Sequence, residues 1–244
     1  MENKRNTHKE FKERWIFIKN ELKEYSSVDL FQKVYLIYNE RIENRYFKPI
    51  ELLRNNKDSC DGFGFSMVAI SCSLIEFLQS TIDGKFDKLS YKNEFMSKYP
   101  ILVSEGLIDY YGGKSGDEFV KFLKELNSRF KEKSNYISNF DSVAKEFYKC
   151  VRCTLLHDAC TRNNWIIREE SDDDTIFDNS NKEEKILYRN NFYELIKNKV
   201  NFEMRDQFLD KDNTELRKNL LKKMDVIFET ANYGKKEDIP FWWN

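Results

Sequence analysis

Residues 115–130, SGDEFVKFLKELNSRF, decide the fold class because they have the pattern of an amphipathic helix. Ser115 and Glu118 have the spacing of a capping box, in which each side chain satisfies a backbone N–H at the start of a helix. Apolar residues then return every three or four positions, so they share one helical face. These are Phe119, Phe122, Leu123, Leu126 and Phe130. The stretch therefore predicts a helix that packs one face against a core.

Similar apolar spacing recurs through most of the chain. Thr7 and Glu10 form another capping box, Pro49 is expected to interrupt the second helix, and Asp83-Gly84 is a turn signal. Only three prolines and eight glycines are present, which favours long helices over a many-turned β-sandwich. We expect helices over about 8–22, 28–42, 65–82, 141–157, 191–209 and 214–228, with short helical pieces between 85 and 111.

A small β element is expected after the helix over about 141–157. Residues 165–167 have strand composition, and 175–177 and 186–188 can pair with them. The sequence thus predicts an all-α bundle with a minor sheet, in one domain over residues 1–244. We divide it into three parts: N-terminal helices (1–56), a core (57–165), and the β element with the C-terminal helices (166–244).

Charge and cysteine content narrow the class of protein. Lys and Arg number 41 against 42 Asp and Glu, and the net charge of −1 argues against a strongly basic nucleic-acid coat. Residues 1–9 lack the apolar stretch that secretion needs. The apolar run at 63–78 is broken by serines and Glu76, so we expect it not to span a membrane. Five cysteines fit reduced thiols better than a disulfide scaffold. We therefore expect a cytoplasmic protein.

Residues 151–158, VRCTLLHD, carry the candidate chemistry. The chain has two histidines, and because His8 lies near the terminus, His157 is the one plausible imidazole of the folded body. Arg152 precedes it by five positions. An arginine and a histidine are the minimum for cleaving RNA without a metal. The guanidinium stabilises charge on the phosphate in the transition state, and the imidazole moves the proton.

At these residues the chain resembles a known family. The Arg-x4-His spacing, late in an all-helical core, is similar to the motif of the HEPN superfamily. The phrase YKCVR at 148–152, with Leu156-His157 and NWII at 164–167, resembles a branch of HEPN-like proteins, and SLIEFLQ at 73–79 is similar to an earlier helix of that branch. The resemblance covers roughly 62–168, which is under half of the chain.

The resemblance implies an activity and an assembly. HEPN ribonucleases are homodimers whose two motif helices build one cleft. They cut single-stranded RNA without a metal or cofactor and leave a 2′,3′-cyclic phosphate. Many act in phage defence or as toxins, and an acidic residue from an earlier helix often supports the pair. Catalytic roles are thus implied for Arg152, His157 and Glu76, with a protein regulator as a further partner. Other members have lost catalysis and bind RNA, nucleotides or proteins.

Helix geometry leaves alternatives open for these residues. Residues five apart on a regular helix lie about 140° apart, so Arg152 and His157 converge only through an irregular helix, a long reach or a partner chain. The alternative is a core histidine bonded to a carbonyl and an arginine in a salt bridge. Glu76 lies among apolar residues, where a buried carboxylate needs a partner. Arg152 would serve, unless Glu76 faces solvent.

Three other patterns are weaker. Cys150, Cys153, His157 and Cys160 extend over a helical rise of about 15 Å, too long for one zinc ion, so we expect small core residues instead. The acidic loop at 169–184 lacks the ligand pattern of an EF-hand, and a solvated loop is expected. The glycine-rich residues 112–116 lack the glycine spacing and preceding strand of a phosphate loop, so helix capping explains them better.

The C-terminal residues 239–243, IPFWW, are very apolar for a terminus. We expect them to fold back on the body or on a second subunit. The hypothesis from sequence is a homodimeric HEPN-type endoribonuclease. The alternatives are a catalytically silent module that binds RNA or a partner protein as sensor or scaffold, and a structural helical dimer.

Overall fold

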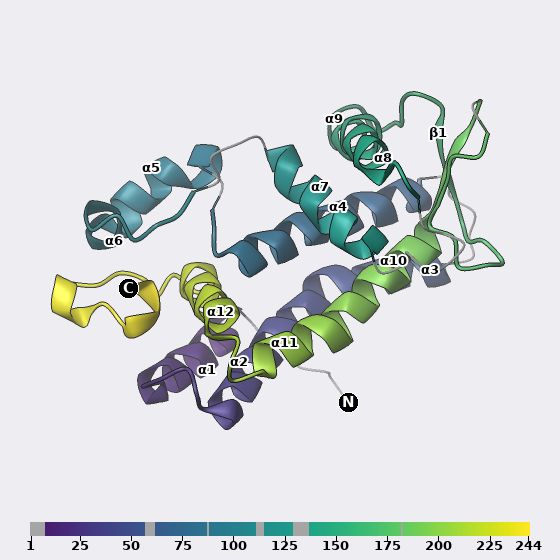
Figure 1. Cartoon of the computed structure of the whole chain (residues 1–244). Coiled ribbons are helices and arrows are strands. Elements are labelled where there is room, and N and C mark those ends of the chain that lie inside the picture. The colour runs from purple at the N-terminus through teal and green to yellow at the C-terminus, as the bar shows by residue number, and fades with distance from the viewer. Residues whose placement is uncertain (1–7, 57–61, 87, 111–114, 129–136, 182) are drawn as a thin grey trace. The chain divides into compact units, whose positions relative to one another are not determined.

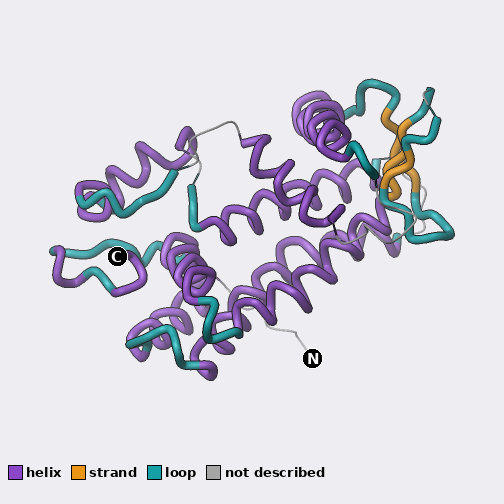
Figure 2. Tube along the Cα trace, in the orientation of Figure 1, coloured by secondary structure: helices purple, strands orange, loops and turns teal. Residues whose placement is uncertain are grey.

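The structure is a computed structural model that describes residues 8–56, 62–86, 88–110, 115–128, 137–181 and 183–244. In this part of the chain helices predominate, and the strands form a single small sheet (Figures 1 and 2). The predicted fold class, helical with a minor β element, is confirmed. Thr7 and Phe130, which the sequence places in a cap and a helix, lie outside the described residues.

The chain forms two compact units, each assembled from separated segments. Unit 1 comprises residues 1–41, 80–113 and 201–244, and unit 2 comprises 42–79 and 114–200. Three of the four changes from one unit to the other fall inside helical segments: α2 (Val28–Ile42), α4 (Phe63–Asp83) and the π-helical turn η3 (Lys199–Met204).

Unit 1 is built from the helices at both ends of the chain and from its middle segment. Gly84, with a φ of +64°, ends α4 in the left-handed conformation that glycine favours, as the Asp83-Gly84 signal predicts. Besides its parts of α2 and α4, the unit contains α1 (His8–Glu21), α5 (Lys88–Lys98), α6 (Pro100–Ser104), α11 (Arg205–Leu209), α12 (Thr214–Ile227) and the 3₁₀ turns η4 (Lys236–Asp238) and η5 (Phe241–Trp243).

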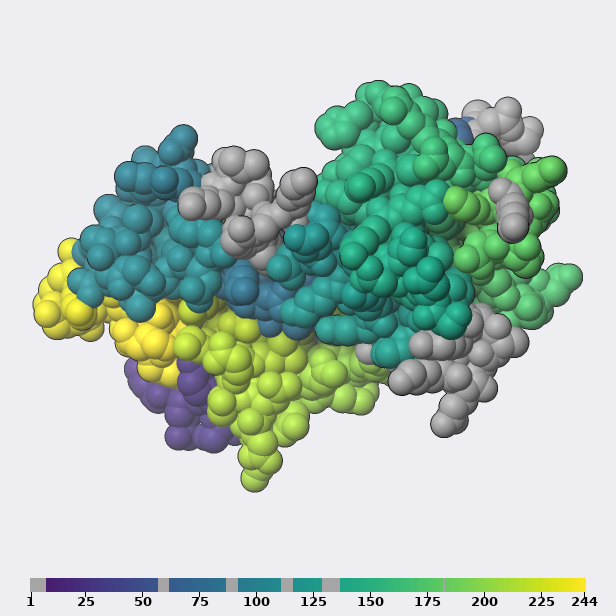
Figure 3. Space-filling model, turned by 45° about the horizontal axis from the view of Figure 1, so that its top comes forward, coloured from purple at the N-terminus to yellow at the C-terminus, as the bar shows by residue number. Residues whose placement is uncertain are grey.

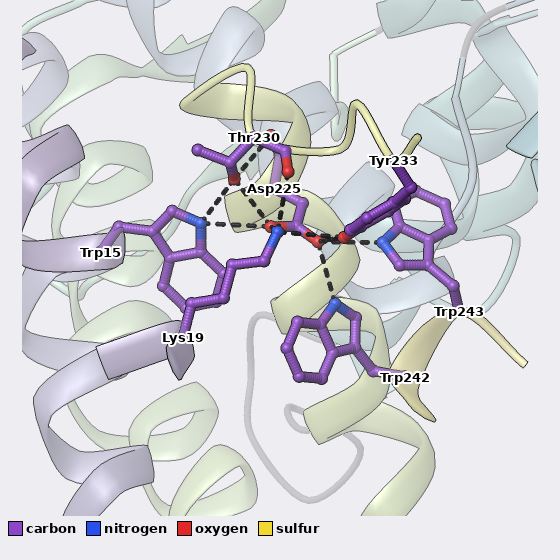
Figure 4. Close-up of polar contacts among 7 residues, drawn as sticks. All are labelled: Trp15, Lys19, Asp225, Thr230, Tyr233, Trp242 and Trp243. Carbon is purple, nitrogen blue, oxygen red and sulfur yellow. Dashed lines mark hydrogen bonds and ion pairs between the residues drawn. The ribbon is translucent and has the colours of Figure 1, made fainter. Parts of the chain in front are cut away.

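Asp225 of α12 is the polar centre of unit 1. Its side chain is fully buried, and three donors reach each carboxylate oxygen at distances from 2.6 to 3.2 Å. They are Trp15, Lys19 and Thr230 at Oδ1, and Tyr233, Trp242 and Trp243 at Oδ2 (Figure 4). We call these seven residues the Asp225 cluster. Protein donors therefore satisfy both oxygens of this buried carboxylate.

The C-terminal segment docks through this cluster. Trp242 and Trp243 are each 1% exposed, and both indole N–H groups donate to Asp225. Burial and the adjacent Asp225 carboxylate raise the pKa of Tyr233, so its hydroxyl stays protonated and remains a donor. Of the two alternatives for the apolar tail, folding back on the body is therefore the one observed.

Unit 2 holds the candidate motif. The side chains of Phe119, Phe122, Leu123 and Leu126 are buried, as the opening pattern predicts. The unit contains the π-helical turn η1 (Glu43–Phe47), α3 (Lys48–Asn55), most of α4, α7 (Ser115–Ser128), α8 (Phe140–Phe147), the π-helical turn η2 (Tyr148–Cys153), α9 (Thr154–Asp158) and α10 (Arg189–Asn198).

The small sheet of unit 2 follows α9. Strands β1 (Trp165–Arg168), β2 (Phe177–Asp178) and β3 (Lys185–Tyr188) lie in the order β1-β3-β2, with β1 parallel and β2 antiparallel to β3. Trp165 packs edge-on against Phe147 of α8, with ring centroids 5.5 Å apart. The predicted β element is thus present, and its aromatic face holds the sheet against the motif helix.

One sequence expectation needs correction, and two further details of the helices add to the sequence analysis. Pro49 does not interrupt the second helix. It lies in the first turn of α3, directly after the π-helical turn η1, and η1 joins α3 to α2. The cap of α12 is Asn213, whose side chain accepts a hydrogen bond from the N–H of Leu216. Finally, the 21-residue α4 has the length and composition to cross a membrane.

The apolar composition of α4 also has an explanation within the fold. In its most apolar window, 56% of α4 is buried against the rest of the chain, as in the core helix of a soluble protein. The expectation that the protein does not enter membranes stays a prediction.

Candidate functional site

The candidate motif lies on one continuous helical segment, which changes from an α-helix to a π-helical turn and back to an α-helix. Helix α8 runs into η2, which contains Arg152, and α9 follows with His157. A π-helical turn carries one extra residue, and such turns occur frequently at functional sites. The predicted helix over 141–157 is therefore confirmed, and it is irregular at Arg152. Figure 3 shows this part of the chain, in the green range of the colour bar, at the surface of unit 2.

Local bonds stabilise this irregular turn. The hydroxyl of Thr154 donates to the carbonyl of Cys150 at 2.6 Å and also lies 3.3 Å from that of Val151. The Cys150 carbonyl accepts a second bond, at 2.8 Å, from the backbone N–H of Arg162. Carbonyls that a regular helix would use internally are thus satisfied from outside it.

Arg152 and Glu76 form an ion pair in the interior of unit 2. Arg152 Nη2 donates to Glu76 Oε2 at 2.8 Å and lies 2.6 Å from Oε1, and the side chains are 16% and 29% exposed. Burial lowers the pKa of Arg152, but the hydrogen bond and charge of Glu76 outweigh it, so the net pKa is raised. The partnership that sequence reasoning proposed for Glu76 is therefore present, and Glu76 does not simply face solvent.

This pair is incompletely satisfied. The approach of Nη2 to Oε1 lacks hydrogen-bond geometry, so Oε1 is buried without a donor among the described residues. Arg152 Nε is likewise buried without an acceptor there. An unmade bond of this kind costs about 1–3 kcal/mol, and each such group in a native protein needs an explanation, such as strain, a bound water or ion, or a functional role.

Two further side chains surround the guanidinium. The Arg152 Cζ atom lies 5.3 Å from the centre of the Tyr148 ring, within the range of a cation–π interaction. Cys72 of α4 is fully buried, and burial, with a smaller effect of Glu76, raises the pKa of its thiol. Cys72 therefore remains a neutral thiol beside the ion pair.

His157 has a different environment. Its side chain is exposed on α9 beside Leu156, which is 48% exposed. Within the described ranges, no hydrogen bond or ion pair joins His157 to Arg152, to Glu76 or to any other side chain. The structure thus brings Arg152 and Glu76 together and leaves the imidazole free at the surface, so it is not the core histidine of the alternative interpretation.

The remaining sequence patterns do not form sites. Of the four candidate zinc ligands, Cys150 is buried and the other three are partly or fully exposed. In the part of the chain that the structure describes, no group of three or more His, Cys, Asp or Glu side chains can hold a metal ion. The expectation that all three cysteines are core residues is therefore wrong for Cys153 and Cys160.

The acidic loop borders a polar hollow of about 550 Å³ between β2 and residues 137–139. Two of its carboxylates are engaged within the loop, because Asp173 accepts from the N–H of Thr175 and Asp178 from Ser180. These hydrogen bonds lower the pKa of both carboxylates. A solvated loop accounts for this geometry. Of the glycine-rich segment at 112–116, residues 112–114 lie outside the described residues.

Compared with family models, curated proteins and solved structures, the chain matches none of them. The resemblance to HEPN proteins therefore stays a prediction. Sequence reasoning also missed Tyr148 as a neighbour of Arg152. Its spacing of four residues from Arg152 was the available signal, since residues four apart lie on one helical face.

Proposed function

We propose that the protein is a HEPN-type endoribonuclease that cleaves single-stranded RNA without a metal ion. In this proposal Arg152 stabilises the negative charge on the phosphate, and His157 transfers the proton to or from the ribose hydroxyl or the leaving oxygen. Glu76 orients the guanidinium. The enzyme acts as a homodimer in the cytoplasm, in phage defence or as a toxin, under the control of a protein regulator.

One observation carries the proposal: Arg152 is held in place by Glu76 yet keeps unused binding capacity. Its Nε has no acceptor among the described residues, and 16% of the side chain is open to solvent. Buried arginine donors are usually satisfied in native proteins, so an Nε without an acceptor leaves capacity for a ligand. A guanidinium fixed in advance and partly open suits the binding of a phosphate group.

The exposed imidazole supports a composite site. His157 and Leu156 lie on the surface of α9, where a second copy of the motif helix can approach. In a dimer, His157 of one subunit would act on a phosphate held by Arg152 of either subunit. This arrangement overcomes the angular separation of the two residues on one helix.

A catalytically silent HEPN module is the second candidate. It is favoured by the ion pair itself, because Glu76 occupies one edge of Arg152 and competes with phosphate for the guanidinium. Such a module would bind RNA or a partner protein without cutting RNA.

The decisive experiment incubates the protein with single-stranded RNA in EDTA. Arg152→Ala and His157→Ala are each expected to lower cleavage by roughly 100-fold or more. Matched controls are Arg162→Ala, an exposed arginine paired with Asp158, and His8→Ala, a histidine of unit 1. Both controls should cut like wild type and leave 2′,3′-cyclic phosphate ends.

The outcomes separate the candidates. Equal cutting by all five proteins would mean a contaminating nuclease and would contradict the proposal. RNA binding without cutting would favour the silent module. A protein that stays monomeric at micromolar concentration while cutting RNA would overturn the composite site.

A further inference from the structure

We propose that Tyr148 is a positioning residue whose ring, seated on Gly116, holds the Arg152 guanidinium in place for the phosphate. The inference rests on the proposed function and adds a residue to its site. Tyr148 and Arg152 are both in η2, four residues apart, and the guanidinium carbon lies 5.3 Å from the ring centroid.

Arg152 is therefore restrained from two directions. The Glu76 carboxylate binds Nη2 at one edge of the guanidinium, whereas the Tyr148 ring contacts the group at 5.3 Å from the centroid. A single carboxylate contact through Nη2 leaves the guanidinium free to swing about that contact. The ring limits this motion, so the two contacts together fix the orientation that a phosphate must meet.

The ring itself is held by α7. A Cβ atom built on Gly116 would lie 2.6 Å from Cε1 and 2.9 Å from Cδ1 of Tyr148, so any larger residue would displace the ring. Phe119, one helical turn further along α7 and fully buried, contacts the same ring at a centroid distance of 5.4 Å. Gly116 therefore allows the close approach of α7 that supports Tyr148 beside Arg152.

This close packing explains why position 116 is occupied by glycine. Gly116 ends the glycine-rich segment, which sequence analysis explained by helix capping. Its φ is not positive, so the backbone conformation does not require glycine at this position. The contact with Tyr148 does require it.

The test measures the mobility of Arg152 by NMR and RNA cleavage in EDTA, on the full chain. The Nε–Hε signal of Arg152 is identified by its disappearance in Arg152→Met. Tyr148→Leu removes the ring, Tyr148→Phe keeps it, and Gly116→Ala pushes it away. Two variants serve as matched controls: Tyr46→Leu removes a ring that contacts Phe77 at 5.9 Å, and Gly62→Ala places a Cβ where nothing lies within 4 Å.

We expect Tyr148→Leu and Gly116→Ala to increase the motion of the Arg152 side chain. They should lower kcat roughly 2- to 30-fold, the range expected for a cation–π contact, with little change in KM. Tyr148→Phe should restore both readouts, and both controls should match wild type. Equal restraint of Arg152 in Tyr148→Leu and wild type would overturn the inference, as would a loss in Tyr148→Phe equal to that in Tyr148→Leu.

The two readouts also separate this inference from the proposed function. The NMR signal is measured without RNA, so it decides the positioning role even if the wild-type protein cuts nothing. In that case increased motion in Tyr148→Leu would support positioning of a binding arginine, while the proposed nuclease function would fail.

Discussion

Asp225 in unit 1 and Glu76 in unit 2 are both carboxylates on helices, surrounded by apolar residues, but they differ in how many donors they receive. Three donors reach each oxygen of Asp225, whose side chain is fully buried. Glu76 is 29% exposed and, among the described residues, has a single hydrogen-bond donor, Arg152, at one of its two oxygens.

The difference separates a structural role from a candidate functional one. A buried network in which each charge is satisfied strengthens the fold and leaves no group for a ligand. A network with an unused acceptor and donor loses stability but retains binding capacity. The Asp225 cluster therefore fits the first description and the Arg152–Glu76 pair the second.

The largest expected effect is that of Asp225→Ala. Removing the carboxylate leaves Lys19 and three indole N–H groups without their acceptor, and breaking a buried charge pair in this way costs about 3–5 kcal/mol of unfolding free energy. Urea denaturation followed by circular dichroism measures the loss. Asp158→Ala, which removes an exposed carboxylate paired with Arg162, is the control and should cause no measurable loss. A similarly small loss of unfolding free energy in both variants would show that the Asp225 cluster contributes no more to stability than an exposed ion pair.

Lys223 is another buried ionisable residue of unit 1, and its effect on stability shows whether its charge is compensated as well as that of Asp225. Burial, with a smaller effect of Arg41, lowers the pKa of Lys223 to about 7. The unfolded chain keeps this proton up to about pH 10.4. Between these values the unfolded state binds more protons, so the lysine makes stability rise with pH from about 7 to 10.

We expect Lys223→Met to stabilise the protein at pH 7 by about 1–4 kcal/mol, because it replaces a charge that is costly to bury. The rise in unfolding free energy between pH 7 and pH 9 should also become smaller. Denaturant titrations at pH 6, 7, 8 and 9 measure both. If the variant is less stable than wild type at pH 6, contacts such as that with Ser80 stabilise the cation more than burial opposes it.

The indole donors allow a finer test of the same cluster. Trp242→Phe and Trp243→Phe each remove one N–H from Asp225 and keep an aromatic ring in the core. Each should lower the unfolding free energy by about 1–3 kcal/mol, the contribution of a hydrogen bond to a charged group. Phe241→Leu, which changes a neighbouring ring without an N–H, is the control for altered packing. An equal loss in all three variants would assign the effect to packing rather than to Asp225.

Local features of the fold could be predicted from the sequence. The spacing of apolar residues predicted the helices, and short apolar runs predicted the strands that contain Trp165 and Leu187. Such patterns depend on residues within one or two turns of each other. The Asp225 cluster could not be predicted in this way, because it joins residues 15, 225 and 243, which no local pattern connects.

The candidate site could be predicted only in part, because some of its features also depend on contacts that no local pattern shows. The pairing of Glu76 with Arg152 follows from the cost of a buried carboxylate. The winding of η2 does not, because apolar spacing cannot fix the one extra residue of a π-helical turn. Gly116 shows the same limit, since its role depends on a ring 32 positions away.

The smallest expected change in stability concerns the Arg152–Glu76 pair itself. Glu76→Leu alone leaves a half-buried cation and should cost about 1 kcal/mol, since the pair is partly exposed to solvent. Adding Arg152→Met removes that cation, and the double variant should be more stable than Glu76→Leu and recover most of the loss. Denaturation of the four proteins in a double-mutant cycle gives the coupling energy.

RNA cleavage, unlike stability, should not recover in the double variant. The double variant, although restored in stability, should cut RNA no better than Arg152→Met alone, because the guanidinium that binds phosphate is absent. A double variant that cuts RNA like wild type would show that the pair is structural. A coupling energy above about 3 kcal/mol would show that the pair holds the fold as Asp225 does, and the distinction between the two carboxylates would disappear.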